Sequence, residues 1–204
     1  MHQNLYKCLG ALVAGGLLCA LPASGEGLLG ERYLSLSYDS FWVETAAYDD
    51  GSGFTLTYNQ PYSDVVDIGG SFEYLAYGDA DGRDELGDFS DQRLLVTATA
   101  YEIPQLNRIW VRFGLGLGMV EHGDDDDTNV AWAVTAGTEY AFGETVVLYP
   151  YLEMNDVWDD GEDTTIAYGV QALVNAGEKF GATLGIEGDQ KLNWTLSIGG
   201  VVRF

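Results

Sequence analysis

Residues 192–204 read LNWTLSIGGVVRF, and every second side chain in this segment is apolar or glycine. One face carries Leu192, Trp194, Leu196, Ile198, Gly200, Val202 and Phe204. The other face carries mostly small or polar residues, such as Asn193, Thr195 and Ser197. A period of two over this length predicts a β-strand with one apolar face and one mostly polar face.

The same alternation recurs upstream and predicts ten strands. They cover 34–39, 54–59, 66–76, 93–100, 109–119, 130–142, 146–155, 166–174, 180–186 and 194–204. The phase within 146–155 stays open, because both faces carry large residues and Pro150 lacks a backbone donor. Eight strands are the alternative if 53–60 or 180–187 is poorly formed. The chain from residue 26 fits one domain, and no segment of it is long and apolar enough for a spanning helix.

The connections between these strands alternate in length. The short turns are 59–63, 103–107, 142–145 and 175–179. The other connections are mostly longer and acidic, and they hold 21 of the 32 Asp and Glu residues: 42–52, 78–91, 121–128, 156–163 and 187–191. Short turns on one side and longer loops on the other are typical of a membrane β-barrel with both termini on the short-turn side.

A strand that ends on an aromatic residue resembles the terminal strand of bacterial outer-membrane β-barrels. The residues that carry this resemblance are Trp194, Leu196, Ile198, Val202 and Phe204. By resemblance they form an assembly signal for the barrel-insertion machinery. Residues 26–204 resemble the barrel domain of the outer-membrane protein A family without its periplasmic domain. The resemblance implies an antiparallel up-and-down barrel in the outer membrane of a Gram-negative-type cell, in contact with lipid and lipopolysaccharide.

The apolar faces support a membrane location. Lipid-facing side chains must be apolar, and aromatic residues such as Tyr38, Trp42, Tyr62 and Phe180 lie near strand ends, where interfacial girdles are expected. A soluble β-sandwich or a lipocalin-like barrel is the alternative. Such a fold would need polar residues on its outer face, and the alternation here leaves that face uniformly apolar.

Residues 1–25 predict a cleaved signal peptide. Lys7 precedes the apolar run 9–21, and small residues at 23 and 25 suit cleavage after Gly25. Both cysteines, Cys8 and Cys19, lie in this segment, so the mature chain has no disulfide or thiolate metal site. Leu18 is too bulky for the usual lipoprotein pattern at Cys19. No cofactor is expected. The formal net charge of −23 argues against a nucleic-acid partner, which would repel the chain.

The inward face of the expected barrel carries charged residues. The lumen-lining candidates are Asp67, Glu73, Arg93, Arg112, Glu139, Glu153 and Arg203. Two interpretations stay open. In one, Arg93 and Arg112 pair with Glu73, Glu139 and Glu153 in a packed polar core. In the other, inward glycines leave a narrow water path, and excess carboxylates favour cations as in carboxylate-lined pores.

Each of the two interpretations of the lumen implies a function. The first hypothesis is a small porin-like channel for ions or small solutes with a cation preference. The second is a non-conducting surface barrel whose acidic loops meet ions, lipopolysaccharide or host surfaces. Asp124, Asp125, Asp126 and Asp127 could hold loop-bound calcium or magnesium, which prefer carboxylate oxygens. A solvated acidic surface is the simpler reading of the same residues.

An enzyme is not expected. Ten strands resemble the omptin proteases, and His122 is the only histidine after residue 25. However, Val120 stands where that family has an aspartate, and the predicted strands look too short to form a tall extracellular rim. Outer-membrane lipid A deacylases and palmitoyltransferases need a histidine with a nearby serine, and no serine lies near His122 in sequence.

Overall fold

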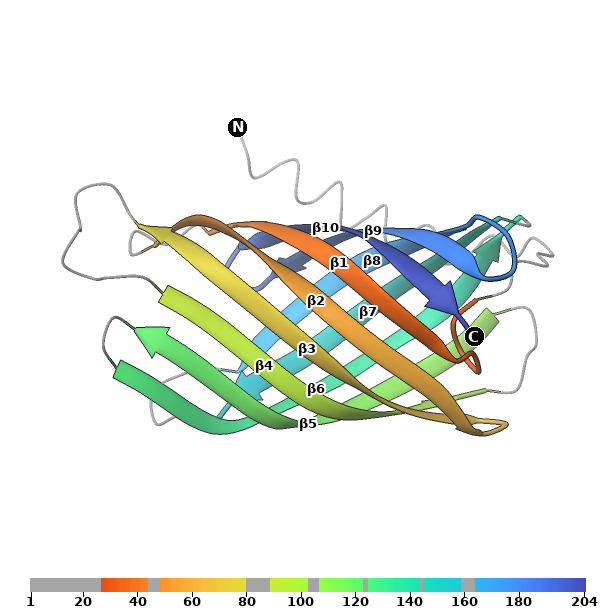
Figure 1. Ribbon diagram of the computed structural model, residues 1–204, viewed down its shortest axis with the longest axis horizontal. Helices are drawn as coiled ribbons and strands as arrows, with labels where there is room; N and C mark the ends of the chain where they lie inside the picture. Colours follow the sequence, from red (N-terminus) through yellow and green to blue (C-terminus); the bar gives the residue numbers. More distant parts are fainter. Residues whose placement is uncertain are drawn as a thin grey trace.

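The computed structural model describes residues 27–43, 48–79, 89–102, 107–122, 125–143, 145–158 and 164–204. They form ten strands: β1 (Tyr33–Trp42), β2 (Tyr48–Ser63), β3 (Val66–Asp79), β4 (Phe89–Tyr101), β5 (Asn107–His122), β6 (Asp125–Phe142), β7 (Val146–Val157), β8 (Thr165–Asn175), β9 (Phe180–Asp189) and β10 (Trp194–Arg203). Each strand pairs with the next in sequence, and β10 pairs with β1, which closes the barrel (Figure 1). The predicted ten-stranded antiparallel fold is confirmed. The described residues contain no helix long and apolar enough to cross a membrane.

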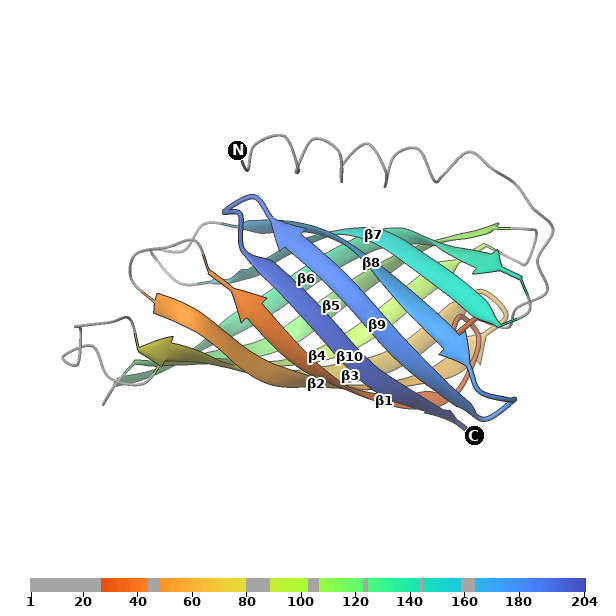
Figure 2. The same cartoon turned by 90° about the horizontal axis from the view of Figure 1, so that it is seen from above.

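The β1–β10 pair closes the sheet without a break in register. Tyr33 pairs with Arg203 and Trp42 pairs with Trp194, and Figure 2 shows these two strands side by side. We call the end of the barrel that holds Tyr33 and Arg203 the turn end, and the opposite end the loop end. The turn end lies at the right in Figure 1, near the C-terminus. A closed ladder pairs the backbone groups of every strand, which a hydrocarbon environment requires.

The outward face is a continuous apolar band. Val96 is 72% exposed, and Leu152 and Ile198 are each 61% exposed. Exposed apolar surface on this scale is unfavourable in water, whereas lipid tails solvate it. Aromatic side chains flank the band, with Tyr168 and Trp194 in an edge-to-face contact at the loop end, 6.1 Å between ring centroids.

The structure resolves the open phase of β7. Val147, Tyr149 and Glu153 face the lumen, and Leu152 and Met154 face outward. Large inward residues fit here because the neighbouring strand carries glycine. A Cβ on Gly169 of β8 would lie 2.7 Å from the Tyr151 hydroxyl, so the tyrosine ring occupies the space that a side chain would need.

Several strands are longer than the alternation predicts. β5 and β6 have 16 and 18 residues, against about 9–11 for a membrane-spanning strand. The prediction of strands too short to extend beyond the membrane is therefore wrong. So is the predicted loop 121–128, because pairing continues to His122 and Asp125. The alternation of apolar and polar residues ends before the strand pairing does, because beyond the lipid both faces of a strand meet water.

Two further connections differ from the prediction: in the structure one is displaced along the chain and the other is shorter. β2 continues through the predicted turn 59–63, and Ser63 pairs with Val66 of β3. β9 extends to Asp189 and β10 begins at Trp194, so most of the predicted loop 187–191 is strand. Glu187 and Asp189, the acidic residues of the second segment, therefore belong to the barrel wall.

Candidate functional site

The segment 27–32 folds into the turn end of the lumen before β1 begins. Leu28 to Glu31 form a tight turn in which the Glu31 N–H donates to the Leu28 carbonyl at 3.2 Å. Gly30 has a φ of 82°, the left-handed conformation that this turn position favours for glycine. The turn directs Leu28 and Leu29 inward and leads the chain back to the first strand.

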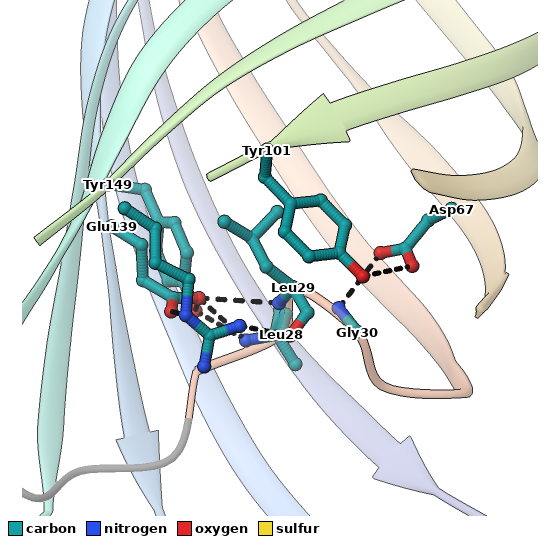
Figure 3. A network of polar contacts seen from close by, with 8 residues as sticks. Leu28, Leu29, Gly30, Asp67, Tyr101, Glu139 and Tyr149 are labelled. Atoms are coloured by element: carbon teal, nitrogen blue, oxygen red, sulfur yellow. Dashed lines mark hydrogen bonds and ion pairs between the residues drawn. The ribbon is translucent and has the colours of Figure 1, made fainter. Parts of the chain in front are cut away.

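Glu139 of β6 binds the backbone of this segment. Its Oε2 accepts hydrogen bonds from the Leu28 N–H at 3.0 Å and the Leu29 N–H at 3.3 Å, and from the Tyr149 hydroxyl at 3.0 Å (Figure 3). The other oxygen, Oε1, lies 3.3 Å from Nε of Arg108. Arg108 also donates to the Leu29 carbonyl at 2.6 Å. Glu139 is only 6% exposed, so these contacts replace the water that its charge would otherwise require.

Asp67 of β3 forms a second anchor on the opposite side of the turn. Its Oδ2 accepts from the Gly30 N–H and from Asn59 Nδ2, both at 3.0 Å. Its Oδ1 accepts from the Tyr101 hydroxyl at 3.0 Å (Figure 3). Asn59 also donates to the Glu31 carbonyl at 3.0 Å. Asp67 is 1% exposed, and its carboxylate is satisfied entirely by donors from the segment and from the wall.

Apolar packing completes the turn end. Leu28 belongs to one buried cluster with five wall residues: Tyr33, Val147, Tyr149, Leu173 and Val201. Leu29 packs with Tyr101 and Trp110 on the other side. Val147 and Leu173 have no exposed surface. The lumen is therefore filled at this end, partly by the wall and partly by residues 27–32.

The middle of the lumen holds an ion pair between neighbouring strands. Nε of Arg93 lies 3.2 Å from a Glu73 oxygen, and its Nη2 lies 3.7 Å from Asp91. The expected pairing of Arg93 with Glu73 is present. Glu153, across the lumen on β7, also interacts electrostatically with Arg93. One guanidinium therefore lies among several carboxylates.

The other expected partners differ from the prediction. Arg112 makes no ion pair among the residues that the structure describes; its Nε donates to Thr99 Oγ1 at 3.1 Å, and its guanidinium lies over the Trp110 ring at 5.5 Å. Glu139 pairs with Arg108 instead. Glu153 accepts from Thr135 and Asn155, each at 2.8 Å. Thr135 on the adjacent strand β6 and Asn155 on β7 itself therefore satisfy the Glu153 carboxylate without an ion pair among the described residues.

Above the filled end the lumen contains a cavity of about 550 Å³. Leu28 and Leu29 line it at the turn end, and loop-end residues such as Lys191 and Asn193 line it at the other end. Its described lining includes three basic residues, Arg93, Arg112 and Lys191. The same lining includes eight carboxylates: Asp39, Asp67, Glu73, Asp91, Glu153, Asp156, Glu187 and Asp189. The cavity is therefore strongly acidic.

The seven predicted lumen residues lie in three different places. Glu73, Arg93, Arg112 and Glu153 line the open part of the cavity. Asp67 and Glu139 instead hold the segment 27–32. Arg203 is 6% exposed at the turn end and donates to Asn175 at 2.7 Å.

Sequence reasoning missed the segment 27–32 and its contacts with Arg108 and Tyr149. No periodicity marks residues outside a strand. The available signal was the excess of three inward carboxylates, Glu73, Glu139 and Glu153, over the two arginines expected to pair with them.

The acidic 124–127 segment remains a predicted metal site. Asp124 lies outside the described residues, Asp125 to Asp127 belong to β6, and Asp127 is exposed. The described part of the chain contains no group of three potential ligands that could hold a metal ion. His122 pairs in register with Phe89 on β4 and Asp125 on β6.

No protein-family model and no curated protein matches the chain. Among solved structures, it is similar to the translocator domain of the autotransporter NalP from Neisseria meningitidis. The TM-score is 0.52 at 12% identity, over 100% of this chain and 96% of that one. The fold is that of bacterial outer-membrane β-barrels.

Two further solved structures are similar at lower TM-scores. The attachment invasion locus protein Ail of Yersinia pestis has a TM-score of 0.43 at 18% identity, over 86% of this chain and 99% of that one. The KdgM porin has a TM-score of 0.47 at 11% identity, over 83% and 99%. At these identities the likeness concerns the fold alone, so function must be argued from the lumen.

Proposed function

We propose that this chain is an outer-membrane barrel of a Gram-negative-type cell whose acidic lumen admits small cations. The observation that carries the proposal is the lining of the cavity, where eight carboxylates outnumber three basic residues among the described positions. Carboxylates that line a narrow water-filled space attract cations and repel anions. The low-dielectric wall and surrounding lipid strengthen this effect relative to bulk water.

The placement of the carboxylates supports this function. Glu73 interacts electrostatically with Asp91, Glu153 and Asp39, which come from β4, β7 and β1. Glu187 of β9 accepts a hydrogen bond from the Tyr151 hydroxyl at 2.6 Å. Acidic groups therefore come from strands around the barrel, and Arg93 neutralises only part of their charge.

The filled turn end favours a second candidate. A barrel closed at one end could be a non-conducting surface protein, with the cavity and the acidic loop end as its interaction surfaces. This alternative rests on the burial of Leu28, Leu29, Val147 and Leu173. The acidic loops would bind calcium or magnesium and through these ions meet anionic lipopolysaccharide.

The remaining assignments complete the proposal. Residues 1–25 are a cleaved signal peptide, the turn end faces the periplasm, and the outward residues Trp194, Leu196, Ile198, Val202 and Phe204 of the last strand address the barrel-assembly machinery. The chain is not an enzyme, because Val120 replaces the aspartate that an omptin-like His122 would need.

Neutralising two lumen carboxylates should lower cation selectivity. In Glu153→Gln combined with Glu187→Gln, an amide oxygen can still accept from Thr135 and Tyr151. Asn155 can turn its own amide so that its oxygen accepts from the new Gln NH2, so the wall should keep its hydrogen bonds. The measurement is the reversal potential of the refolded barrel in a planar bilayer under a salt gradient. We expect the cation-over-anion permeability ratio to fall.

Glu178→Gln is the matched control, because Glu178 is exposed in a turn outside the lumen and its loss should leave the ratio unchanged. An unchanged ratio in the double variant would contradict a carboxylate-lined path. The heat-dependent gel shift shows whether the protein is a folded barrel. If folded protein carries no current, both with and without residues 27–32, only the second candidate is left.

A further inference from the structure

We propose that residues 27–32 form a displaceable stopper, and that a solute crosses the barrel only when this segment leaves the turn end. The inference rests on the proposed passage and adds the element that controls it. The stopper is defined as residues 27–32, and its seat as the wall residues Asp67, Tyr101, Arg108, Glu139 and Tyr149.

The stopper obstructs the lumen. Leu28 and Leu29 are 8% and 7% exposed and form the turn-end limit of the cavity. Figure 3 shows both residues between Glu139 and Tyr149 on one side and Tyr101 and Asp67 on the other. Any path from the acidic cavity to the turn end must pass this position.

The stopper is not part of the sheet. Strand pairing begins at Tyr33, and the ladder between β1 and β10 starts with the pair Tyr33 and Arg203. The backbone N–H groups of Leu28, Leu29 and Gly30 donate to side chains of the wall instead. Removing the segment would therefore break side-chain contacts and one backbone hydrogen bond, from Phe204 to Arg32, and leave the ladder of the closed barrel intact.

The seat can exist without its occupant. Asp67, Glu139 and Arg108 are charged, and water can hydrate them once the stopper leaves. Release from a purely apolar seat would cost much more free energy, because water does not stabilise exposed apolar surface in this way. The stopper would stay attached to the barrel at its junction with β1. There the Phe204 N–H donates to the Arg32 carbonyl at 3.1 Å.

The stopper fits against its seat only if residue 27 has no side chain. A Cβ at residue 27 would overlap the Glu139 carboxylate at both oxygens, Oε2 and Oε1. The carboxylate cannot move aside freely, because Arg108, Tyr149 and two backbone N–H groups hold it. A side chain at residue 27 should therefore unseat the stopper without altering the wall.

The test compares three refolded proteins in planar bilayers: the chain from residue 26, the chain from residue 33, and Gly27→Val in the longer chain. Several hydrogen bonds hold the segment, and their loss should raise the fraction of open barrels by about tenfold or more. We therefore expect the mean current of the chain from residue 33 to exceed that of the chain from residue 26 by about tenfold or more. Gly27→Val should give an intermediate current.

The outcomes separate the stopper from the passage. Equal currents through the long and short chains would overturn the stopper and leave the passage standing. No current from either folded chain would overturn the passage and the stopper with it. The heat-dependent gel shift shows which proteins are folded.

A second readout does not depend on conduction. The chain after Cys19 has no cysteine, so Leu29→Cys introduces a single thiol. With the stopper seated, a water-soluble thiol reagent should label this cysteine much more slowly than Glu178→Cys, an exposed position. Equal labelling rates would overturn the stopper, and faster labelling of Leu29→Cys in the Gly27→Val background would support it.

Discussion

Glu139→Ala should lower the free energy of unfolding by about 3 kcal/mol, because it leaves several buried donors without an acceptor. The Leu29 N–H and the Tyr149 hydroxyl lose their acceptor, and Arg108 loses its carboxylate partner. The Leu28 N–H loses one of two acceptors and keeps the Tyr149 oxygen at 2.8 Å. Urea-induced unfolding of the barrel in lipid vesicles, followed by tryptophan fluorescence, measures the change. Glu139→Gln should cost less, since an amide oxygen still accepts.

The chain from residue 33 provides the control for this substitution. It lacks the Leu28 and Leu29 donors, so Glu139→Ala should cost less there, and the difference is the coupling between the carboxylate and the stopper. The same loss in both chains would mean that Glu139 stabilises the wall alone and does not hold residues 27–32.

Leu115→Arg should destabilise the membrane-inserted barrel by about 2–4 kcal/mol, the cost of an arginine on the lipid face at the bilayer midplane. Leu115 lies near the middle of β5 and pairs with Val96 and Trp132, which also belong to the apolar band. The measurement is again the free energy of unfolding in lipid vesicles.

Phe142→Arg is the matched control. Phe142 is 58% exposed and Leu115 is 60% exposed, but Phe142 is the last residue of β6 at the turn end. An arginine near the interface should cost only about 0–1 kcal/mol. Equal costs at the two positions would contradict a lipid-facing band centred on Leu115.

The fold could be predicted because lipid imposes a strict alternation. Along β5, Ile109, Val111, Phe113 and Leu115 face outward while Arg112 and Gly114 face the lumen. This pattern identifies strands, their number and their outward faces. It is lost where its cause is absent: Asp125 to Asp127 pair with β5 beyond the apolar band, where neither face has to be apolar.

The lumen was less predictable for a different reason. Alternation states that Glu139 and Arg112 face inward, but their partners depend on which strands lie opposite and on what occupies the interior. Arg112 was expected to pair with a carboxylate and donates to Thr99 instead. Glu139 is satisfied largely by backbone N–H groups of residues 28 and 29, and a backbone donor carries no sequence signal.

Cysteine accessibility along β10 tests the central claim, a barrel whose lumen holds an acidic cavity toward the loop end and is closed at the turn end. Single cysteines are placed at the inward positions 195, 197 and 201 and at the outward positions 196 and 198, in lipid vesicles with a water-soluble thiol reagent. Thr195 and Ser197 line the acidic cavity, Val201 is 2% exposed beside Leu28, and Leu196 and Ile198 face lipid. We expect labelling at 195 and 197, and protection at 196, 198 and 201. Labelling at 201 as fast as at 195 would contradict the closed end, and labelling at 196 and 198 would contradict the barrel's placement in the membrane.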